Sequence, residues 1–264
     1  MNFRICISLF LLCCLLQPST AQQPVTKPKE VTVKAMTYNT YSGRKQGIDK
    51  IAEVIKKENP DIVSLQEIER NTEINPWDTP KKLSELTGMK YYYFAHALDI
   101  PTGGDYGNVI LSKYPVSEEK SFKLSVLKEG DYVRSFGYVK VAKEGKEFYF
   151  ATTHLDHKYE DAARLKQIDE ILVCVEQLDK PVILGGDLNS RRGSATMAAF
   201  QKYFTVNCLS DGAPWTVPVS SPAYACDWLI YTPNEAFTVK AYNVCYWADK
   251  ESDHYPVVAT YLIK

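Results

Sequence analysis

The segment ILGGDLNSRR, residues 183–192, decides how this chain folds. It joins an apolar run over residues 181–186, which is typical of a buried strand, to Asp187 and, two positions later, to Asn189. Asp and Asn favour turns, where their side chains bond the local backbone. The segment therefore predicts a buried strand that brings two polar side chains to its end.

Similar apolar runs recur along the chain and predict two packed β-sheets. Helical spacing of apolar residues predicts helices over 47–60 and 161–178, and a third is expected near 80–87. Segments 68–80 and 209–223 are rich in polar turn residues and are predicted to be surface loops. Many strands with few helices favour two sheets packed face to face, with helices outside. The predicted strands are 31–38, 61–66, 91–95, 108–112, 132–141, 147–153, 181–186, 227–232, 237–247 and 255–263.

The start of the chain differs in kind from the rest. A basic residue in MNFR, an apolar run of about a dozen residues and the small residues before Ala21 are the layout of a secretory signal peptide. The apolar run is shorter than the ~20 residues that span a bilayer. We expect a signal peptide over residues 1–21, a flexible leader over 22–30 and one large domain over 31–264, exported to the periplasm or the medium. A lipoprotein anchored at Cys13 or Cys14 is the alternative.

The charge of the chain disfavours the binding of polyanions by bulk attraction. The whole sequence carries a net charge of −1, and the signal peptide holds one arginine and no acidic residue, so its removal changes the net charge to −2. A near-neutral surface can hold nucleic acid only through local contacts. The net charge therefore disfavours a non-specific nuclease.

Four of the seven cysteines, Cys174, Cys208, Cys226 and Cys245, lie beyond the signal peptide. An even number in an exported chain permits up to two disulfides, and the spacings match no structural zinc motif. Cys174 flanks the apolar stripe of the helix expected at 161–178. A packed, free thiol is the alternative for that residue.

Side chains suited to acid–base or metal chemistry stand at the ends of several predicted strands. An antiparallel strand begins at the edge where its parallel neighbours end, so these groups are expected on one rim of the sheets. Each one alone also fits a structural role in a turn, a solvated loop or a strand cap. Four predicted strands are followed by Asn39, by Glu67, by His154 with Asp156, and by Asp187 with Asn189, while Asp227 and the pair Asp253 and His254 stand at the start of two others.

Together these residue types fit a divalent-cation phosphoester hydrolase. Mg²⁺ prefers one or two carboxylates together with waters and phosphate oxygens, and Glu67, helped by Asp253 and the Asn39 amide, supplies such ligands. Mn²⁺ or Ca²⁺ is the alternative ion. We expect the glycines before Asp187 to let the backbone pass close beneath the bound anion.

The remaining groups divide into water activation and charge stabilisation. Asp187 is suited to accept a proton from an attacking water while Asn189 holds the phosphate. His254 needs a partner that fixes its tautomer and supports its charged form, and Asp227 is the available carboxylate. Protonated His254 would stabilise the developing charge or supply a proton.

Seven short motifs resemble those of the endonuclease/exonuclease/phosphatase superfamily, which includes deoxyribonucleases, abasic-site endonucleases, neutral sphingomyelinases and inositol-polyphosphate phosphatases. The motifs are MTYNTYSG, SLQEIE, GNVILSKYP, ATTHLDH, ILGGDLNS, DWLIY and SDHYPV, and they occur in that family's order over residues 31–264. Each motif alone is weakly specific, whereas seven in order are strongly specific. The resemblance implies an α/β fold, a four-layer sandwich of two packed mixed β-sheets flanked by helices, with the site at one rim.

The resemblance also implies roles for individual residues. It marks Glu67 as the main metal ligand and Asn39 and Asp253 as lesser ones, Asp187 and Asn189 as the water-activating and phosphate-holding pair, and Asp227 with His254 as the Asp–His pair. His154 matches a second histidine, Arg134 a phosphate-contacting arginine and Asn108 a further substrate-binding residue. The sequence departs from the family pattern around Asp227, where Cys226 precedes and Trp228 follows, and at Tyr41, where some nucleases have another acid.

The substrate depends on loops that vary within a shared chemistry. The sequence contains neither a Lys/Arg-rich stripe for a duplex nor a long apolar hairpin for membrane insertion, so a small or medium phosphoester is preferred. An exported deoxyribonuclease-like endonuclease is the alternative. A catalytically silent binding module is a third possibility, disfavoured because Glu67, Asp187 and His254 are all present.

Overall fold

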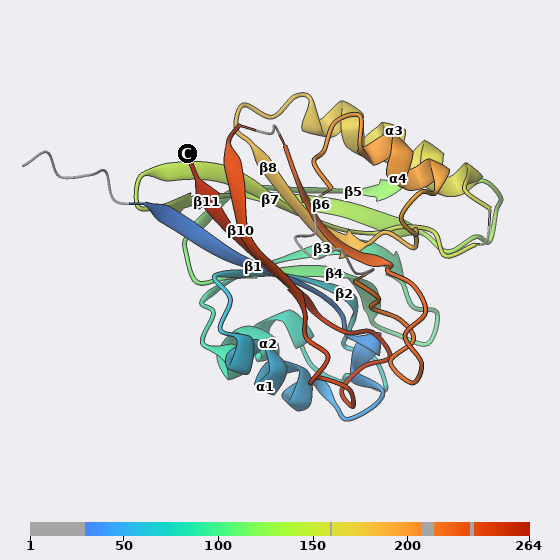
Figure 1. Cartoon of the computed structure of the whole chain (residues 1–264). Coiled ribbons are helices and arrows are strands. Elements are labelled where there is room, and N and C mark those ends of the chain that lie inside the picture. The colour runs from blue at the N-terminus through green and yellow to red at the C-terminus, as the bar shows by residue number, and fades with distance from the viewer. Residues whose placement is uncertain (1–29, 159, 207–213, 233–234) are drawn as a thin grey trace, which may run out of the picture.

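Two mixed β-sheets form the centre of the molecule, in which the computed structural model describes residues 30–158, 160–206, 214–232 and 235–264 (Figure 1). The first sheet has the order β10 (Phe237–Val244), β11 (Val257–Ile263), β1 (Val31–Asn39), β2 (Ile62–Arg70), β4 (Asp105–Ser112) and β3 (Tyr91–Asp99). The second has the order β5 (Val116–Leu124), β6 (Arg134–Lys143), β7 (Lys146–His154), β8 (Val182–Asp187) and β9 (Asp227–Tyr231). Within each sheet one pair is parallel, β1 with β2 and β7 with β8, and the others are antiparallel.

Helices cover the outer faces of both sheets. In Figure 1, α1 (Ile48–Glu58) and α2 (Thr79–Thr87) lie against the first sheet, while α3 (Ala162–Val175) and α4 (Ala195–Phe200) lie against the second. A short 3₁₀ helix, η1 (Tyr41–Gly43), follows β1. The inner faces of the sheets meet in a core that includes Val33, Ile62, Val139, Phe150 and Ile183. The predicted four-layer α/β sandwich is confirmed.

All ten predicted strands and three predicted helices are present, but three elements, η1, β5 and α4, were not predicted. Strand β5 is an edge strand with mostly exposed side chains, so it lacks the apolar alternation that marks a half-buried strand. Helix α4 has only six residues, too few for a helical stripe, and begins where the Ser194 side chain accepts a hydrogen bond from the Met197 backbone N–H.

The predicted surface loop over 68–80 is present over residues 71–78, most of which are exposed, but both ends of the predicted range belong to β2 and α2. Strand β2 continues to Arg70, and the side chains of Glu69, Thr72 and Asn75 are buried. Their polar groups are satisfied locally, because Thr72 Oγ1 donates to Glu69 Oε2 at 3.0 Å and Asn75 Nδ2 donates to the Ser42 carbonyl at 3.0 Å. The polar side chains of this exposed loop therefore include two, Thr72 and Asn75, that are buried and anchor it by internal hydrogen bonds.

Parts of other predictions fall outside the described residues. The signal peptide, nearly all of the leader and residues 209–213 of the second predicted loop lie there, while Thr216 in that loop is buried and not at the surface. Cys174, Cys226 and Cys245 are free thiols, and Cys208 is outside the described residues. No helix in the described part of the chain is long and apolar enough to cross a membrane.

The glycines of the opening segment have a structural role, and the expectation that they also pass beneath an anion stays a prediction. A Cβ on Gly185 would lie 2.9 Å from Ser64 Cβ and 3.2 Å from Thr37 Cβ, both of the facing sheet. A Cβ on Gly186 would lie 2.5 Å from the Thr153 carbonyl oxygen of the paired strand β7. The glycines therefore allow close sheet packing and strand pairing directly before Asp187.

We expect Gly185→Ala to lower the free energy of unfolding by about 1–3 kcal/mol, because the added methyl overpacks the space between the sheets. Urea unfolding followed by fluorescence measures the change. Gly145→Ala is the control: its φ of +80° strains the backbone, but nothing lies within 4 Å of its Cβ. A smaller loss for Gly185→Ala than for this control would contradict the packing role.

Candidate active site

The ends of four strands bring the predicted polar residues to one rim. β1 and β2 are parallel, and Asn39 at the end of β1 pairs with Gln66, which is next to Glu67 within β2. β7 and β8 are also parallel, so His154 pairs with Asp187. The antiparallel strand β9 starts at the same edge, where Asp227 pairs with Asp187. The rim expected from the sequence is therefore present in the fold.

A cavity of about 410 Å³ opens at this rim. It is lined by Ser42, Arg44, Glu67, Glu69, Tyr106, Tyr132, Arg134, His154, His157, Asp187, Asn189 and His254. The lining comes from both sheets and from the segments that connect them. Residues that are far apart in the sequence thus share one small, polar space.

A β-bulge directs Glu67 into the cavity. The register between β2 and β4 shifts between Leu65 and Ile68, and Glu67 has a φ of +58°, which is uncommon for a residue other than glycine. Asn39 Nδ2 donates to Glu67 Oε1 at 3.1 Å, while no described residue donates to Oε2. Burial raises the pKa of Glu67, and the Asn39 hydrogen bond opposes this change. One carboxylate oxygen therefore remains open toward the cavity.

Asp187 is held at the centre of the rim by two hydrogen-bond donors and has His154 as a close neighbour. Its Oδ1 accepts from the Asn189 backbone N–H at 2.9 Å, and its Oδ2 accepts from Asn39 Nδ2 at 3.0 Å and lies 3.4 Å from His154 Nε2. Burial, followed by the nearby charge of Asp227, raises the pKa of Asp187 to about 6. The carboxylate is thus fixed in place and ionised at neutral pH.

His254 forms a buried pair with Asp227. His254 Nδ1 lies 2.8 Å from Asp227 Oδ2 and donates to it, which turns Nε2 away from Asp227. Burial opposes the charge on the imidazole, but the charge and hydrogen bond of Asp227 outweigh this and raise the pKa of His254 to about 10. At neutral pH, His254 is therefore an imidazolium at the wall of the cavity.

His154 is neutral, in contrast to His254. Arg134 Nη1 lies 3.0 Å from His154 Nδ1, and because a guanidinium can only donate, Nδ1 must accept. The ring proton then sits on Nε2, which faces Asp187. Burial, followed by the charge of Arg134, holds the pKa of His154 well below its usual 6.5. The neutral His154 thus places its protonated Nε2 3.4 Å from Asp187 Oδ2.

Arg134 is a buried cation without a carboxylate partner among the described residues. Its side chain also donates to the Tyr106 hydroxyl at 3.1 Å and lies 3.3 Å from His157 Nδ1, while its Nε has no hydrogen-bond partner in the part of the chain that the structure describes. Only 5% of the residue is exposed. A buried charge without a counter-ion is costly, so a guanidinium at a cavity wall favours an anionic ligand.

The other three predicted residues lie in different surroundings. Asn189 lines the cavity with a φ of +46°, and one of its amide hydrogens is donated to the Leu155 carbonyl at 3.0 Å. Asp253 lines a neighbouring cavity with Lys45, although its charge still raises the pKa of Glu67. Asn108 does not line the cavity, because its amide is bonded to Ser135 of strand β6.

Six residues that line the cavity were not predicted for the site. They are Ser42, Arg44, Glu69, Tyr106, Tyr132 and His157. Two had a usable signal in the sequence, since Glu69 stands two positions after Glu67 on the same strand, and His157 stands three after His154. The others come from segments whose approach to the rim depends on the tertiary fold.

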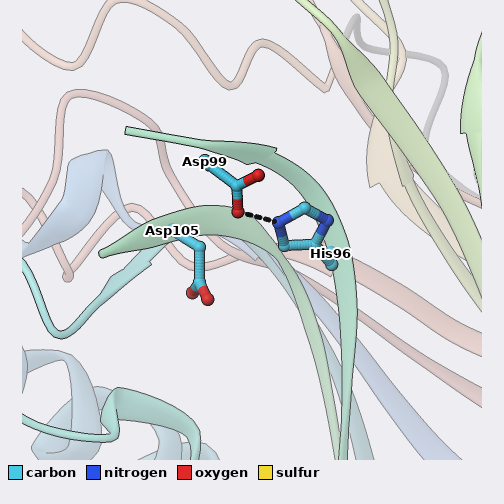
Figure 2. Close-up of side chains that lie close together, drawn as sticks. All are labelled: His96, Asp99 and Asp105. Carbon is cyan, nitrogen blue, oxygen red and sulfur yellow. Dashed lines mark hydrogen bonds and ion pairs between the residues drawn. The ribbon is translucent and has the colours of Figure 1, made fainter. Parts of the chain in front are cut away.

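Two groups of histidine and aspartate place possible ligand atoms within 4.8 Å among the described residues: Asp187, Asp227 and His254 at the rim, and His96, Asp99 and Asp105 in the β3–β4 hairpin. Figure 2 shows His96 and Asp99 facing each other at 3.0 Å, while the Asp105 carboxylate points away from them. Both Asp105 oxygens accept from Arg70, at 2.6 and 3.0 Å. The hairpin group is therefore explained by hydrogen bonds and ion pairs.

Comparison with known proteins agrees with this architecture. The chain is 25% identical over 252 residues to the protein YbhP of Escherichia coli (strain K12), covering 88% of this chain and 96% of that protein. It is 23% identical over 313 residues to sphingomyelinase C of Bacillus cereus, covering 93% of each chain. The crystal structure of an endonuclease/exonuclease/phosphatase from Beutenbergia cavernae DSM 12333 shares the fold, with a TM-score of 0.76 and 23% identity over 88% of this chain and 72% of that chain. Because its residues 36–254 match the Endonuclease/Exonuclease/phosphatase family, the chain belongs to that family of phosphoester hydrolases.

Proposed function

We propose that the chain is an exported, divalent-metal-dependent phosphoester hydrolase that directs water in line at the phosphorus of a small or medium ester. One observation carries this proposal: Glu67, Asp187 and His254 line the same cavity as Arg134, a buried cation without a carboxylate partner in the described structure. A phosphate ester and its metal require four kinds of group. They are a carboxylate with an open oxygen, a fixed base, an imidazolium and a guanidinium that can pair with the phosphate.

The donor set at the rim fits a hard cation. Glu67 offers its open Oε2, and the Asn39 side-chain oxygen, which accepts from the Tyr41 N–H at 3.1 Å, is a proposed further ligand. Asp253, which lines the neighbouring cavity but whose charge acts on Glu67, is the proposed third. Oxygen ligands suit Mg²⁺, with Mn²⁺ or Ca²⁺ as alternatives. When bound, the ion polarises the phosphoryl group and neutralises part of its charge.

Asp187 is the proposed base for the attacking water. It is ionised at neutral pH, accepts hydrogen bonds from Asn39 and the Asn189 N–H, and lies 3.4 Å from His154 Nε2, so its position is set before substrate binds. Asn189 stands beside it with a second amide hydrogen that can donate to a phosphate oxygen. Neutral His154, whose Nε2 lies 3.4 Å from Oδ2, is proposed to help orient the carboxylate.

His254 and Arg134 are proposed to stabilise the negative charge that develops on the phosphate. His254 carries its proton at neutral pH, and its Nε2 is the edge not engaged by Asp227. The imidazolium can donate to a phosphate oxygen or protonate the leaving alcohol. A bound phosphate would give Arg134 a counter-ion, which no described residue supplies.

Hydrolysis of soluble phosphomonoesters and phosphodiesters by the purified mature protein tests this proposal. We expect turnover with Mg²⁺ or Mn²⁺ and loss of turnover with a chelator, restored by adding the ion back. Plasmid DNA in a parallel assay examines the nuclease alternative. Nicking of the plasmid without turnover of any small ester would overturn the preference, and ligand-induced heat stability without need for a divalent ion would indicate a binding module.

Glu67→Ala is expected to weaken metal activation and turnover together, raising the Mg²⁺ concentration for half-maximal activity by at least about tenfold, because the main carboxylate ligand is lost. Titration of activity against Mg²⁺ measures this. Glu119→Ala removes an exposed carboxylate of edge strand β5 and serves as the control. An unchanged Mg²⁺ requirement in Glu67→Ala would remove Glu67 from the proposed metal site.

A further inference from the structure

The cavity at the rim has no aliphatic side chain in its lining. Its twelve lining residues are charged or polar, apart from the rings of Tyr106 and Tyr132. Pockets that accept apolar ligands are lined mainly by hydrophobic side chains, whereas this lining offers donors, acceptors and aromatic rings. An acyl chain would gain little here, and a hydroxylated group would find partners.

An arc of side chains extends from the proposed reacting centre along the cavity wall. Arg44 Nη2 forms an ion pair with Glu69 Oε1. Glu69 on β2 is the cross-strand partner of Tyr106 on β4, and the ring of Tyr106 meets that of Tyr132 edge to face, with centroids 5.8 Å apart and an interplanar angle of 83°. At the other end of this arc, the Tyr106 hydroxyl lies 3.4 Å from His154. The wall and the centre are thus one connected structure.

Tyr132 is an exposed ring held in a fixed place. Its residue is 49% exposed, yet its ring is contacted by Tyr106, by His157 at 6.3 Å edge to face, and by the Arg134 guanidinium at 5.2 Å. An aromatic side chain that is exposed but fixed loses little conformational entropy when a ligand packs on it. Tyr132 therefore has the properties of a stacking platform.

Arg44 and Glu69 place a donor and an acceptor next to each other. Glu69 is fixed by Arg44 and by Thr72 Oγ1, which donates to Oε2 at 3.0 Å. The Arg44 side chain is 41% exposed, and no other described residue contacts its guanidinium through a hydrogen bond. A guanidinium beside a carboxylate can bind two neighbouring hydroxyl groups, one accepting and one donating.

We propose that Arg44, Glu69 and Tyr132 bind the alcohol part of the substrate, and that this part is a sugar or cyclitol ring with neighbouring hydroxyls. The inference deepens the proposed function and depends on it. The ring packs its C–H face on Tyr132, its hydroxyls bond Arg44 and Glu69, and its phosphate reaches Arg134 and His254. A glyceride or a nucleotide base uses only part of this surface.

Calorimetric binding to the full mature chain carrying Asp187→Asn, in the presence of Mg²⁺, tests the inference without turnover. The ligands are myo-inositol 1-phosphate, glucose 6-phosphate, glycerol 1-phosphate, uridine 5′-monophosphate and inorganic phosphate. We expect at least one ring phosphate to bind at least about tenfold more tightly than glycerol 1-phosphate. Adding Tyr132→Ala should remove about tenfold of that affinity and leave the affinity for inorganic phosphate unchanged, because only the alcohol part touches Tyr132.

Conservative variants separate binding from a structural role. Tyr132→Phe keeps the ring and should keep the affinity, while Arg44→Gln should weaken the ring phosphates and not inorganic phosphate. Equal weakening of inorganic phosphate by Tyr132→Ala, or tightest binding of the nucleotide, would overturn the inference. Turnover of small esters without preference for rings would overturn it while the proposed function stands, and absence of all phosphate binding would overturn both.

Discussion

Replacement of His254 by alanine is expected to lower kcat on a small phosphoester by about 10²- to 10⁴-fold, the usual contribution of a positioned acid–base group. His254 is protonated at neutral pH and lines the cavity beside Asp187 and Arg134. Its loss removes a positive charge and a proton donor from the place where charge develops on the phosphate. Steady-state kinetics at saturating Mg²⁺ measures the effect, with circular dichroism as the check that the variant folds. Full activity in His254→Ala would discard the proposed mechanism.

Asp227→Asn is the companion variant, because it keeps the imidazole of His254 and removes the negative charge that stabilises the protonated form of that imidazole. Burial lowers the pKa of His254, and Asp227 makes the largest contribution in the other direction, so that the pKa rises from 6.5 to about 10. Without that carboxylate, burial dominates and the pKa of His254 falls, so the acid form is lost at lower pH. The unsubstituted enzyme should therefore stay active as pH rises toward about 10, while Asp227→Asn should lose activity within the window between neutrality and that value. An unchanged alkaline side of the pH profile would show that Asp227 does not control His254.

Strand ends could be predicted from the sequence because sheet geometry leaves few choices. Once the runs before Asn39, Glu67, His154 and Asp187 are identified as buried strands, parallel pairing places their ends at one edge. Asp227 follows from the same rule, since an antiparallel neighbour starts where Asp187 ends. The architecture and the location of the candidate site are thus consequences of a local pattern repeated along the chain.

Loops and close packing could not be predicted in the same way. Arg44 and Tyr132 reach the cavity through connections whose path depends on both sheets, and no local periodicity marks them. The need for Gly185 arises only when Ser64 of the facing sheet comes into contact, at a separation in sequence of more than a hundred residues. The direction of Glu67 depends on a bulge opposite β4, which an alternating pattern does not reveal.

Asp187→Asn should lower kcat by about 10²- to 10⁴-fold and also remove the acidic side of the pH profile. The pKa of Asp187 is raised to about 6, so the carboxylate is ionised above this value and becomes protonated as pH falls through it. A protonated Asp187 cannot accept the proton of the attacking water, and the enzyme should lose activity as pH falls through about 6. An asparagine does not titrate, so the residual activity of the variant should be flat across the same range.

Two conditions make this measurement specific for Asp187. The pKa of Glu67 is also raised, so protonation of Glu67 is a second source of an acidic decline. Saturating Mg²⁺ suppresses this contribution, because the metal competes with the proton for its ligand Glu67 but not for the base Asp187. Asp156→Asn is the matched control, since Asp156 is a buried carboxylate two positions beyond His154 that does not line the cavity. We expect this variant to keep both kcat and the acidic decline near pH 6. If that decline persists in Asp187→Asn, the proton of the attacking water goes to another group, and the assignment of Asp187 as the base fails.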